Sequence, residues 1–405
     1  MSDNKVTLLV NGSSVYEHWI DCSITSELSA LARSFSVTIT ANLPQGKSIL
    51  QQFHLGDTVQ VMIGADVVCT GYIEALPVSY DANSVSASIS GRSKTCDLVD
   101  CSVCPPGRAI TMSTSGGWSS KLKPEKGRIV PAPAVSAISW RQQKLETIIA
   151  QMAAPFDIKF VVENGSLSEV RDHDCDPTQT VLENLKNLVQ KDDLFLMDTP
   201  QGNLTVVQKG SKTATDMLVL GKNVLSGSAS FDGSKLYSEY RTLGQGSGTD
   251  TKTGKAVSTY NASCTNTLVP RFRIKTTDNK GQGSNPSCQR QSDGDMLFDA
   301  MQFYRTSYSV QGWRQSDGSL WEVNSLVKVT DELLGLEMMT MLITKVIYTI
   351  NEGGLITQLE CVPPDGFRAE TSPSSENKGW KGKSGKAKTS KETSKDLSFI
   401  KGKNE

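Results

Sequence analysis

Short segments in which apolar and polar residues alternate follow one another through the first 95 residues. Residues 35–40 read Phe-Ser-Val-Thr-Ile-Thr, which is typical of a β-strand with one face in water. Asn11-Gly12 lies between two such segments and predicts a hairpin, because both residues accept the positive φ angles of a type I′ turn. Similar segments occupy 59–63, 71–73 and 85–89. Residues 1–95 are therefore expected to form a small β-barrel or sandwich domain.

The period of the hydrophobic pattern changes in the middle of the chain. A helix is predicted over 140–153, ended by Pro155, and a second is predicted to start at Asp176-Pro177, an N-cap followed by proline. The residues expected to point inward are Leu145, Ile148, Ile149, Met152, Val181, Leu182, Leu185, Leu188 and Val189. With a strand at 158–162 and a hairpin at 199–203, these helices predict an α+β domain over 96–223. Its residues 105–137 are rich in Pro, Gly and Ser, and a long loop is expected there.

Strand-like segments return from residue 224. A polar stretch at 245–292 and a predicted helix at 293–308 interrupt them, as an insertion over 245–308. The segments 326–329, 342–346 and 357–361 repeat the order of 58–61, 71–75 and 85–89, at a nearly constant offset. This repeat favours an internal duplication, so residues 224–367 are expected to form a second barrel similar to the first. The predicted fold is α+β and β-rich, with two similar small barrels flanking the α+β domain.

Residues 368–405 form a low-complexity tail rich in Ser, Lys and Gly. The tail holds 10 Lys and Arg against 5 acidic residues, and such a composition buries too little apolar surface to fold alone. Two interpretations stay open, a solvated linker and a segment that contacts anionic nucleic acid or lipid. Near its end Leu397, Phe399 and Ile400 interrupt the polar run, which suggests a short segment that docks onto a partner protein.

Composition and charge narrow the class of protein. Lys and Arg number 42 against 43 Asp and Glu, a formal net charge of −1, so a basic nucleic-acid-binding body is not expected. No apolar run reaches the roughly 18 residues of a membrane span, and the N-terminus lacks a secretory pattern. The 9 cysteines are scattered and odd in number. Reduced thiols in a cytoplasm are therefore expected rather than a disulfide framework.

One acidic segment has the outline of a calcium site. Asp172, Asp174, Asp176 and Glu183 match positions 1, 3, 5 and 12 of an EF-hand loop. Pro177, however, occupies position 6, where the turn requires glycine. A helix start, with acidic residues near the positive end of the helix dipole, is the favoured interpretation.

Cys96, Cys101 and Cys104 have the spacing of the first three ligands of a plant-type iron–sulfur site. The next cysteine, Cys175, belongs to a different predicted element, so structural or incidental thiols are favoured. Three histidines offer little for zinc or acid–base chemistry, and no nucleophile elbow or phosphate-binding loop is present. The sequence thus predicts no catalytic, cofactor-binding or metal-binding residues, and no enzyme.

Several strings along the chain match a known family in order and spacing. They are Gly91-Arg92-Ser93 with Asp97-Leu98-Val99-Asp100-Cys101, Ala154-Pro155-Phe156-Asp157-Ile158, Tyr240-Arg241-Thr242-Leu243-Gly244-Gln245, Gly312-Trp313-Arg314 with Gly318-Ser319-Leu320-Trp321, and Val362-Pro363-Pro364-Asp365-Gly366-Phe367. With the order of barrel, α+β domain and barrel, the chain resembles the central baseplate hub proteins of contractile-tailed phages, of the Mu-like type. The Lys/Ser-rich tail departs from the family pattern.

The resemblance implies a virion structural protein that forms a homotrimer in the tail baseplate and is made in the host cytoplasm. Two tail-tube-like barrels per chain would give six units in the trimeric ring, which would join a sixfold tail tube to a threefold spike. The implied partners are the tail tube protein, the central spike protein, other baseplate subunits and phage DNA passing through a channel.

Two other classes of function stay open at this stage. One is a phage-associated enzyme, either a peptidoglycan hydrolase or an iron–sulfur protein built on the three clustered cysteines. The other is the hub part of a contractile secretion-system spike, which is expected to carry a fused needle domain, and no repetitive β-helix is present.

Overall fold

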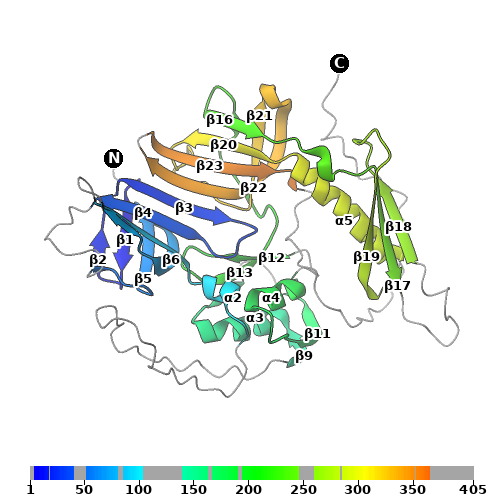
Figure 1. Cartoon of the computed structure of the whole chain (residues 1–405), viewed down its shortest axis with the longest axis horizontal. Helices are drawn as coiled ribbons and strands as arrows, with labels where there is room; N and C mark the ends of the chain where they lie inside the picture. Colours follow the sequence, from blue (N-terminus) through cyan, green and yellow to red (C-terminus); the bar gives the residue numbers. More distant parts are fainter. Residues whose placement is uncertain are drawn as a thin grey trace.

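The computed structural model describes residues 4–17, 19–40, 52–80, 85–103, 139–162, 167–189, 194–245, 260–282, 285–351 and 353–364. The predicted loop at 105–137 and the tail at 368–405 lie outside these residues. β-Strands dominate, and the few helices gather beside and below the largest sheet (Figure 1). Among the described residues no helix is long and apolar enough to cross a membrane.

The first eight strands form one sheet unit, which we call the first unit. They are β1 (Val6–Val10), β2 (Ser14–Tyr16), β3 (Asp21–Glu27), β4 (Ser34–Thr40), β5 (Thr58–Ile63), β6 (Asp66–Ala75), β7 (Val78–Tyr80) and β8 (Val85–Ser93). Burial alternates along β1, β3 and β5, as it does in strands with one face in water. Strands were predicted from the sequence at β1 and β5 but not at β3. The predicted hairpin joins β1 to β2, with Asn11 and Gly12 at φ angles of 50° and 70°.

The last strands of the chain form the second unit. They are β16 (Val224–Ala229), β20 (Thr306–Gln311), β21 (Ser325–Asp331), β22 (Leu336–Asn351) and β23 (Gly354–Val362), with a 3-10 turn η5 at Glu332–Leu334. Two short strands, β14 (Lys212–Thr213) and β15 (Leu218–Val219), pair with β21.

Both units have the same order of strand pairing. It runs β3-β4-β8-β6-β5 in the first unit and β16-β20-β23-β22-β21 in the second. The irregularities correspond as well, because a register shift at Ile73/Ala75 in β6 matches one at Ile343/Lys345 in β22. The duplication inferred from the constant offset between similar segments is therefore present in the topology.

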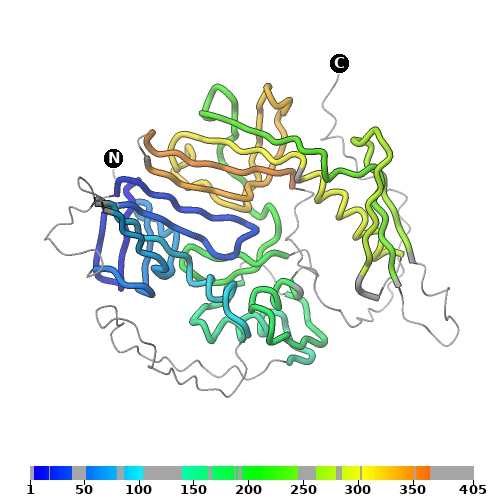
Figure 2. The backbone as a smooth tube through the Cα atoms, in the orientation of Figure 1, coloured from blue at the N-terminus to red at the C-terminus, as the bar shows by residue number. Residues whose placement is uncertain are grey.

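The prediction of two small closed barrels is wrong for the part of the chain that the structure describes. There the two units join into one 15-stranded sheet, in the order β16-β20-β23-β22-β3-β4-β8-β6-β5-β1-β2 along its main path. The first unit does not close on itself, because β3 pairs with β22 of the second unit rather than with β1 or β2. The N-terminal and C-terminal strands consequently lie side by side (Figure 2).

The middle of the chain forms a smaller α+β body below the large sheet (Figure 1). Its elements are α2 (Cys96–Asp100), β9 (Ser139–Lys144), α3 (Leu145–Ala153), η1 (Ala154–Phe156), β10 (Phe160–Val162), β11 (Glu169–Asp174), α4 (Val181–Val189), β12 (Leu194–Asp198) and β13 (Leu204–Gln208). The nine residues predicted to point inward from the two helices are all buried in one core. The predicted hairpin at 199–203 joins β12 to β13.

The two helices that were predicted for this body, α3 and α4, both start later than predicted. Residues 140–144 are part of strand β9, because they pair with β11, which follows helix α3 in the chain. The second helix does not start at Asp176-Pro177. Its first turn is capped at Thr180, whose hydroxyl accepts from the Glu183 N–H at 3.2 Å, while the Glu183 carboxylate accepts from the Thr180 N–H at 3.0 Å. This capping box overrides the Asp-Pro signal.

The insertion after residue 230 forms a separate layer at one side of the sheet (Figure 1). It contains η3 (Gly233–Lys235), β17 (Glu239–Gln245), β18 (Tyr260–Thr265), β19 (Ile274–Gln282) and α5 (Asn285–Phe303). The helix predicted at 293–308 thus begins earlier, at Asn285, and ends at Phe303, since 306–311 are taken up by strand β20. Proline at the second position of α5 is compatible with its first turn.

Candidate functional site

The junction between the two units is the feature that fixes their relative position. β22 is 16 residues long; its first part pairs with β21 and its last part with β3, from Lys345 opposite Glu27 to Ile350 opposite Cys22. The Lys345 ammonium lies 3.1 Å from the Glu27 carboxylate. Burial opposes ionisation of Glu27, but hydrogen bonds from Ser29 and Lys345 keep its pKa below the ordinary value.

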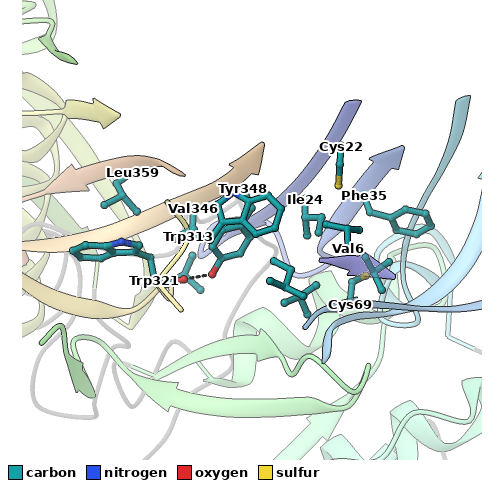
Figure 3. Packing of buried hydrophobic residues seen from close by; sticks show 14 of the residues in the cluster. Val6, Cys22, Ile24, Phe35, Cys69, Trp313, Trp321, Val346, Tyr348 and Leu359 are labelled. Carbon is teal, nitrogen blue, oxygen red and sulfur yellow. Dashed lines mark hydrogen bonds between the residues drawn. The ribbon is translucent and has the colours of Figure 1, made fainter. Parts of the chain in front are cut away.

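Three aromatic side chains fill the core at this junction (Figure 3). The Tyr348 hydroxyl donates to the Trp321 carbonyl oxygen, and Tyr348 packs edge-on against Trp313 with ring centroids 6.2 Å apart. The Trp313 indole N–H donates to the carbonyl oxygens of Thr349 and Ile356, at 3.1 and 3.2 Å. Trp313 therefore ties the loop after β20 to both β22 and β23.

Arg314, the next residue, connects this loop to the first unit. Its guanidinium lies 2.7 Å from the Asp66 carboxylate and donates to the Ile63 carbonyl oxygen at 3.1 Å and to Asn4 Oδ1 at 3.1 Å. The side chain is 18% exposed, so these contacts are partly shielded from water. The string Gly312-Trp313-Arg314 thus holds the two units together.

A buried ion pair joins the first unit to the middle body. Arg33, just before β4, places its Nε 2.9 Å from Asp198 Oδ1 at the end of β12, and the two side chains are 14% and 3% exposed. Arg33 also donates to the carbonyl oxygens of Asp198 and of Val68 in β6, both at 3.2 Å. Burial raises the pKa of the Asp198 carboxyl, and the positive charge of Arg33 limits that rise.

A small cavity of about 170 Å³ lies beside this ion pair, where the two units and the middle body meet. Its lining includes Arg33, Asp198, Trp321 and Tyr348. The Asp198 carboxylate is buried and held by Arg33, and the Tyr348 hydroxyl is held by a carbonyl oxygen. This arrangement is that of a structural ion pair, and it offers no activated base or nucleophile among these groups.

The acidic segment with the outline of a calcium site is neutralised by arginine. Asp172 and Asp174 lie on β11, and Arg141 on the neighbouring strand β9 approaches their carboxylates at 3.4 and 2.9 Å. Asp176 accepts a hydrogen bond from the Thr178 N–H at 2.9 Å, and Glu183 caps α4. Among the described residues no group of three or more His, Cys, Asp or Glu side chains is arranged to hold a metal ion.

The described part of the cysteine cluster is not arranged as a thiolate site. Cys96 is buried at the start of α2, and burial raises the pKa of its thiol to about 12. Burial also raises the pKa of Cys101, which follows the same helix. Metal ligation requires the thiolate, so both shifts oppose it. Cys104 lies outside the described residues.

The predicted docking residues Leu397, Phe399 and Ile400 also lie outside the described residues. The structure instead draws attention to Arg33, Asp198 and Arg314, of which only Arg314 belonged to a string singled out in the sequence. Arg33 and Asp198 are 165 residues apart in the chain. No local pattern marks either of them, because what makes them a pair is the packing of two distant elements.

Models of three domain families match successive parts of the chain. Residues 5–93 match the N-terminal domain of Mu phage baseplate assembly protein GpP-like, residues 129–208 match the second domain of baseplate hub protein gp44-like, and residues 295–370 match the fourth domain of Mu phage baseplate assembly protein GpP. Together the three matches cover more than half of the chain.

Whole-length relatives give the same result. Baseplate hub protein gp44 of Escherichia phage Mu is 26% identical over 380 residues, which are 90% of this chain and 89% of that protein. The crystal structure of the prophage MuSo2 43 kDa tail protein from Shewanella oneidensis is 25% identical with a TM-score of 0.73, over 89% of this chain and 98% of that one. A tail protein from Neisseria meningitidis MC58 shares the fold, with 19% identity and a TM-score of 0.68, over 90% and 99% of the two chains.

Fold and matches together define a structural protein of the phage tail baseplate. The chain belongs to the family of Mu-like baseplate hub proteins, as the resemblance of its sequence strings predicted. The proteins it matches in this family are structural baseplate components rather than enzymes.

Proposed function

We propose that three copies of this hub protein form a ring that joins the sixfold tail tube to the threefold central spike, and that the ring leaves a channel for DNA ejection. One observation carries the proposal. Each chain contains two units with the same order of strand pairing, placed side by side in a single sheet. Three such chains present six similar units to one side and threefold symmetry to the other.

The proposed partners are the tail tube protein, the central spike protein and other baseplate subunits, with phage DNA passing through. The hub would have no chemistry of its own, in keeping with the structural ion pair between the first unit and the middle body. Residues 1–367 carry a formal net charge of −6. A negative body is compatible with a channel that does not retain DNA by counterion release. Assembly would take place in the host cytoplasm before the hub becomes part of the virion.

The mass of the hub in solution tests the ring. We expect multi-angle light scattering of the purified 43.8 kDa chain to give three times the monomer mass for the chain alone, or, once the spike protein of the same genome is added, the mass of a complex that holds three hub chains together with the spike. The spike alone serves as the control for its own oligomeric state. A hub that stays monomeric with and without the spike would contradict the proposal.

We further propose that Leu397, Phe399 and Ile400 dock the tail onto a partner of the hub. Deleting residues 396–405 is expected to weaken retention of the hub on immobilised spike or tube protein at least tenfold, because it removes the apolar residues at the end of the tail. Deleting 381–390 removes the same number of residues and leaves these three in place, so it serves as the matched control. Unchanged retention after deletion of residues 396–405 would contradict the proposed docking role.

A further inference from the structure

Within the chain, β3 pairs with β22. The strands that correspond to these two in the other unit have edges that pair with no strand among the described residues. We propose that the edge formed by β7 and the end of β6 in one copy pairs, antiparallel, with β16 of the next copy. This inference rests on the proposed trimer and specifies its interface.

The correspondence follows from the strand registers. Ile73 lies opposite Gly91 as Ile343 lies opposite Cys361, so β6 through β8 correspond to β22 and β23, with Ile73 equivalent to Ile343. Asp21 lies opposite Thr38 in the first unit, and Ser226 lies opposite Ser309 in the second. Thr38 and Ser309 are equivalent, because Thr38 lies opposite Ser88 and Ser309 lies opposite Gln358, the residue that corresponds to Ser88. Strand β3 therefore corresponds to β16, with Asp21 equivalent to Ser226.

With these two equivalences, the pairing of β22 with β3 inside one chain can be translated into a pairing between two chains. Within the chain, residues 345–350 of β22 pair with residues 27–22 of β3. The same pairing between copies places residues 75–80 opposite residues 232–227. Ser79 would then lie opposite Ser228, and Val78 opposite Ala229.

Both strands in question have a free edge among the described residues. β7 pairs only with β8, and β16 is the last strand of the sheet, where it pairs with β20. Its first residue, Val224, also forms a bridge with Leu220, outside the segment 227–232 used here. Large apolar side chains on these segments are left in water, with Val78 39%, Leu225 56% and Phe231 46% exposed. A free edge flanked by exposed apolar residues is an open template for another strand.

The hydrogen-bonding directions of the two edges agree with this register. The Ser230 N–H donates to the Arg305 carbonyl, toward β20, so the alternate residues Ala229 and Phe231 direct their backbone groups to the open edge. On the other side, the Pro77 carbonyl accepts from the Ser88 N–H, toward β8. The missing N–H of Pro77 therefore faces β8, and Val78 directs its backbone groups outward.

The register also brings apolar groups together. Phe231 would lie opposite Leu76, a half-buried residue that packs against the main core. Repeating the contact three times closes a ring in which internal β22–β3 junctions alternate with intermolecular ones. A head-to-tail contact of this kind gives a closed ring when its rotation is one third of a turn.

A designed disulfide tests the register. Ser79 and Ser228 are both exposed, and the directions above make them a non-hydrogen-bonded pair, with Cα atoms about 4.5 Å apart, within the range of a disulfide. We expect S79C/S228C hub, oxidised in its trimeric form, to give covalent dimers and trimers on a non-reducing gel. The control A75C/S228C displaces one cysteine by four residues, about 13 Å along the strand, and is expected to give at least tenfold less product. Wild-type hub reports any reaction of the 9 native cysteines.

The outcomes separate this inference from the proposed function. A trimer by light scattering in which S79C/S228C cross-links no better than the control would overturn the strand pairing and leave the ring intact. A hub that is monomeric even with the spike, and does not cross-link, would overturn both. If the hub has the mass of a trimer, and S79C/S228C cross-links while the control A75C/S228C does not, both the strand pairing and the ring are supported.

Discussion

Asp198→Ala is expected to lower the free energy of unfolding by about 3–5 kcal/mol, because it leaves a buried arginine without its counter-ion. The Arg33 side chain is 14% exposed and that of Asp198 is 3% exposed, so water cannot replace the lost partner at little cost. Since Arg33 contacts β12 and the Val68 carbonyl of β6, the first unit and the middle body should loosen together. Urea unfolding followed by circular dichroism measures the change.

Two further variants show whether pairing is the cause. Replacing both partners, R33M/D198L, removes both charges and is expected to recover most of the loss, because no uncompensated buried charge remains. Glu322→Ala breaks the exposed pair of Lys212 and Glu322, 2.6 Å apart, and should cost less than about 1 kcal/mol. A loss for Asp198→Ala no larger than that of Glu322→Ala would contradict the structural role of the pair.

Trp313→Ala is expected to cost about 3–5 kcal/mol through the cavity that it leaves in the main core. Trp313 is fully buried, and its indole N–H bridges the carbonyl oxygens of Thr349 and Ile356. Because its loop also positions Arg314 against the first unit, the variant should loosen the junction between the units. The unfolding midpoint in urea and the susceptibility of the native chain to protease report this loss.

Trp313→Phe separates volume from hydrogen bonding. It keeps most of the buried ring, loses the N–H donor, and is expected to cost about 1–3 kcal/mol. Phe272→Ala, at an aromatic residue that is 80% exposed, provides the control and should stay within about 0.5 kcal/mol of wild type. A Trp313→Ala variant as stable as the Phe272→Ala variant would refute the role given to this side chain.

Local patterns predicted the features that depend on neighbours in the chain. The strands β1 and β5, the Asn11-Gly12 turn and the inward faces of α3 and α4 all follow from residues a few positions apart. Helix ends were predicted less well. Residues 140–144 have a helical pattern and yet form a strand, because their partner strand β11 lies beyond the helix that follows.

The sequence by itself determined the family, the internal repeat and the one-sided burial of the strands, because each is written in residue order and spacing. Only the tertiary structure decided that the units form an open, shared sheet. That outcome depends on which strand pairs with the edge of β3, and its partner β22 lies far along the chain from it. The same holds for Arg33 and Asp198, whose pairing arises from packing between distant segments and leaves no local signal in the sequence. Burial makes the loss of either partner alone costly, because the other charge is then left uncompensated.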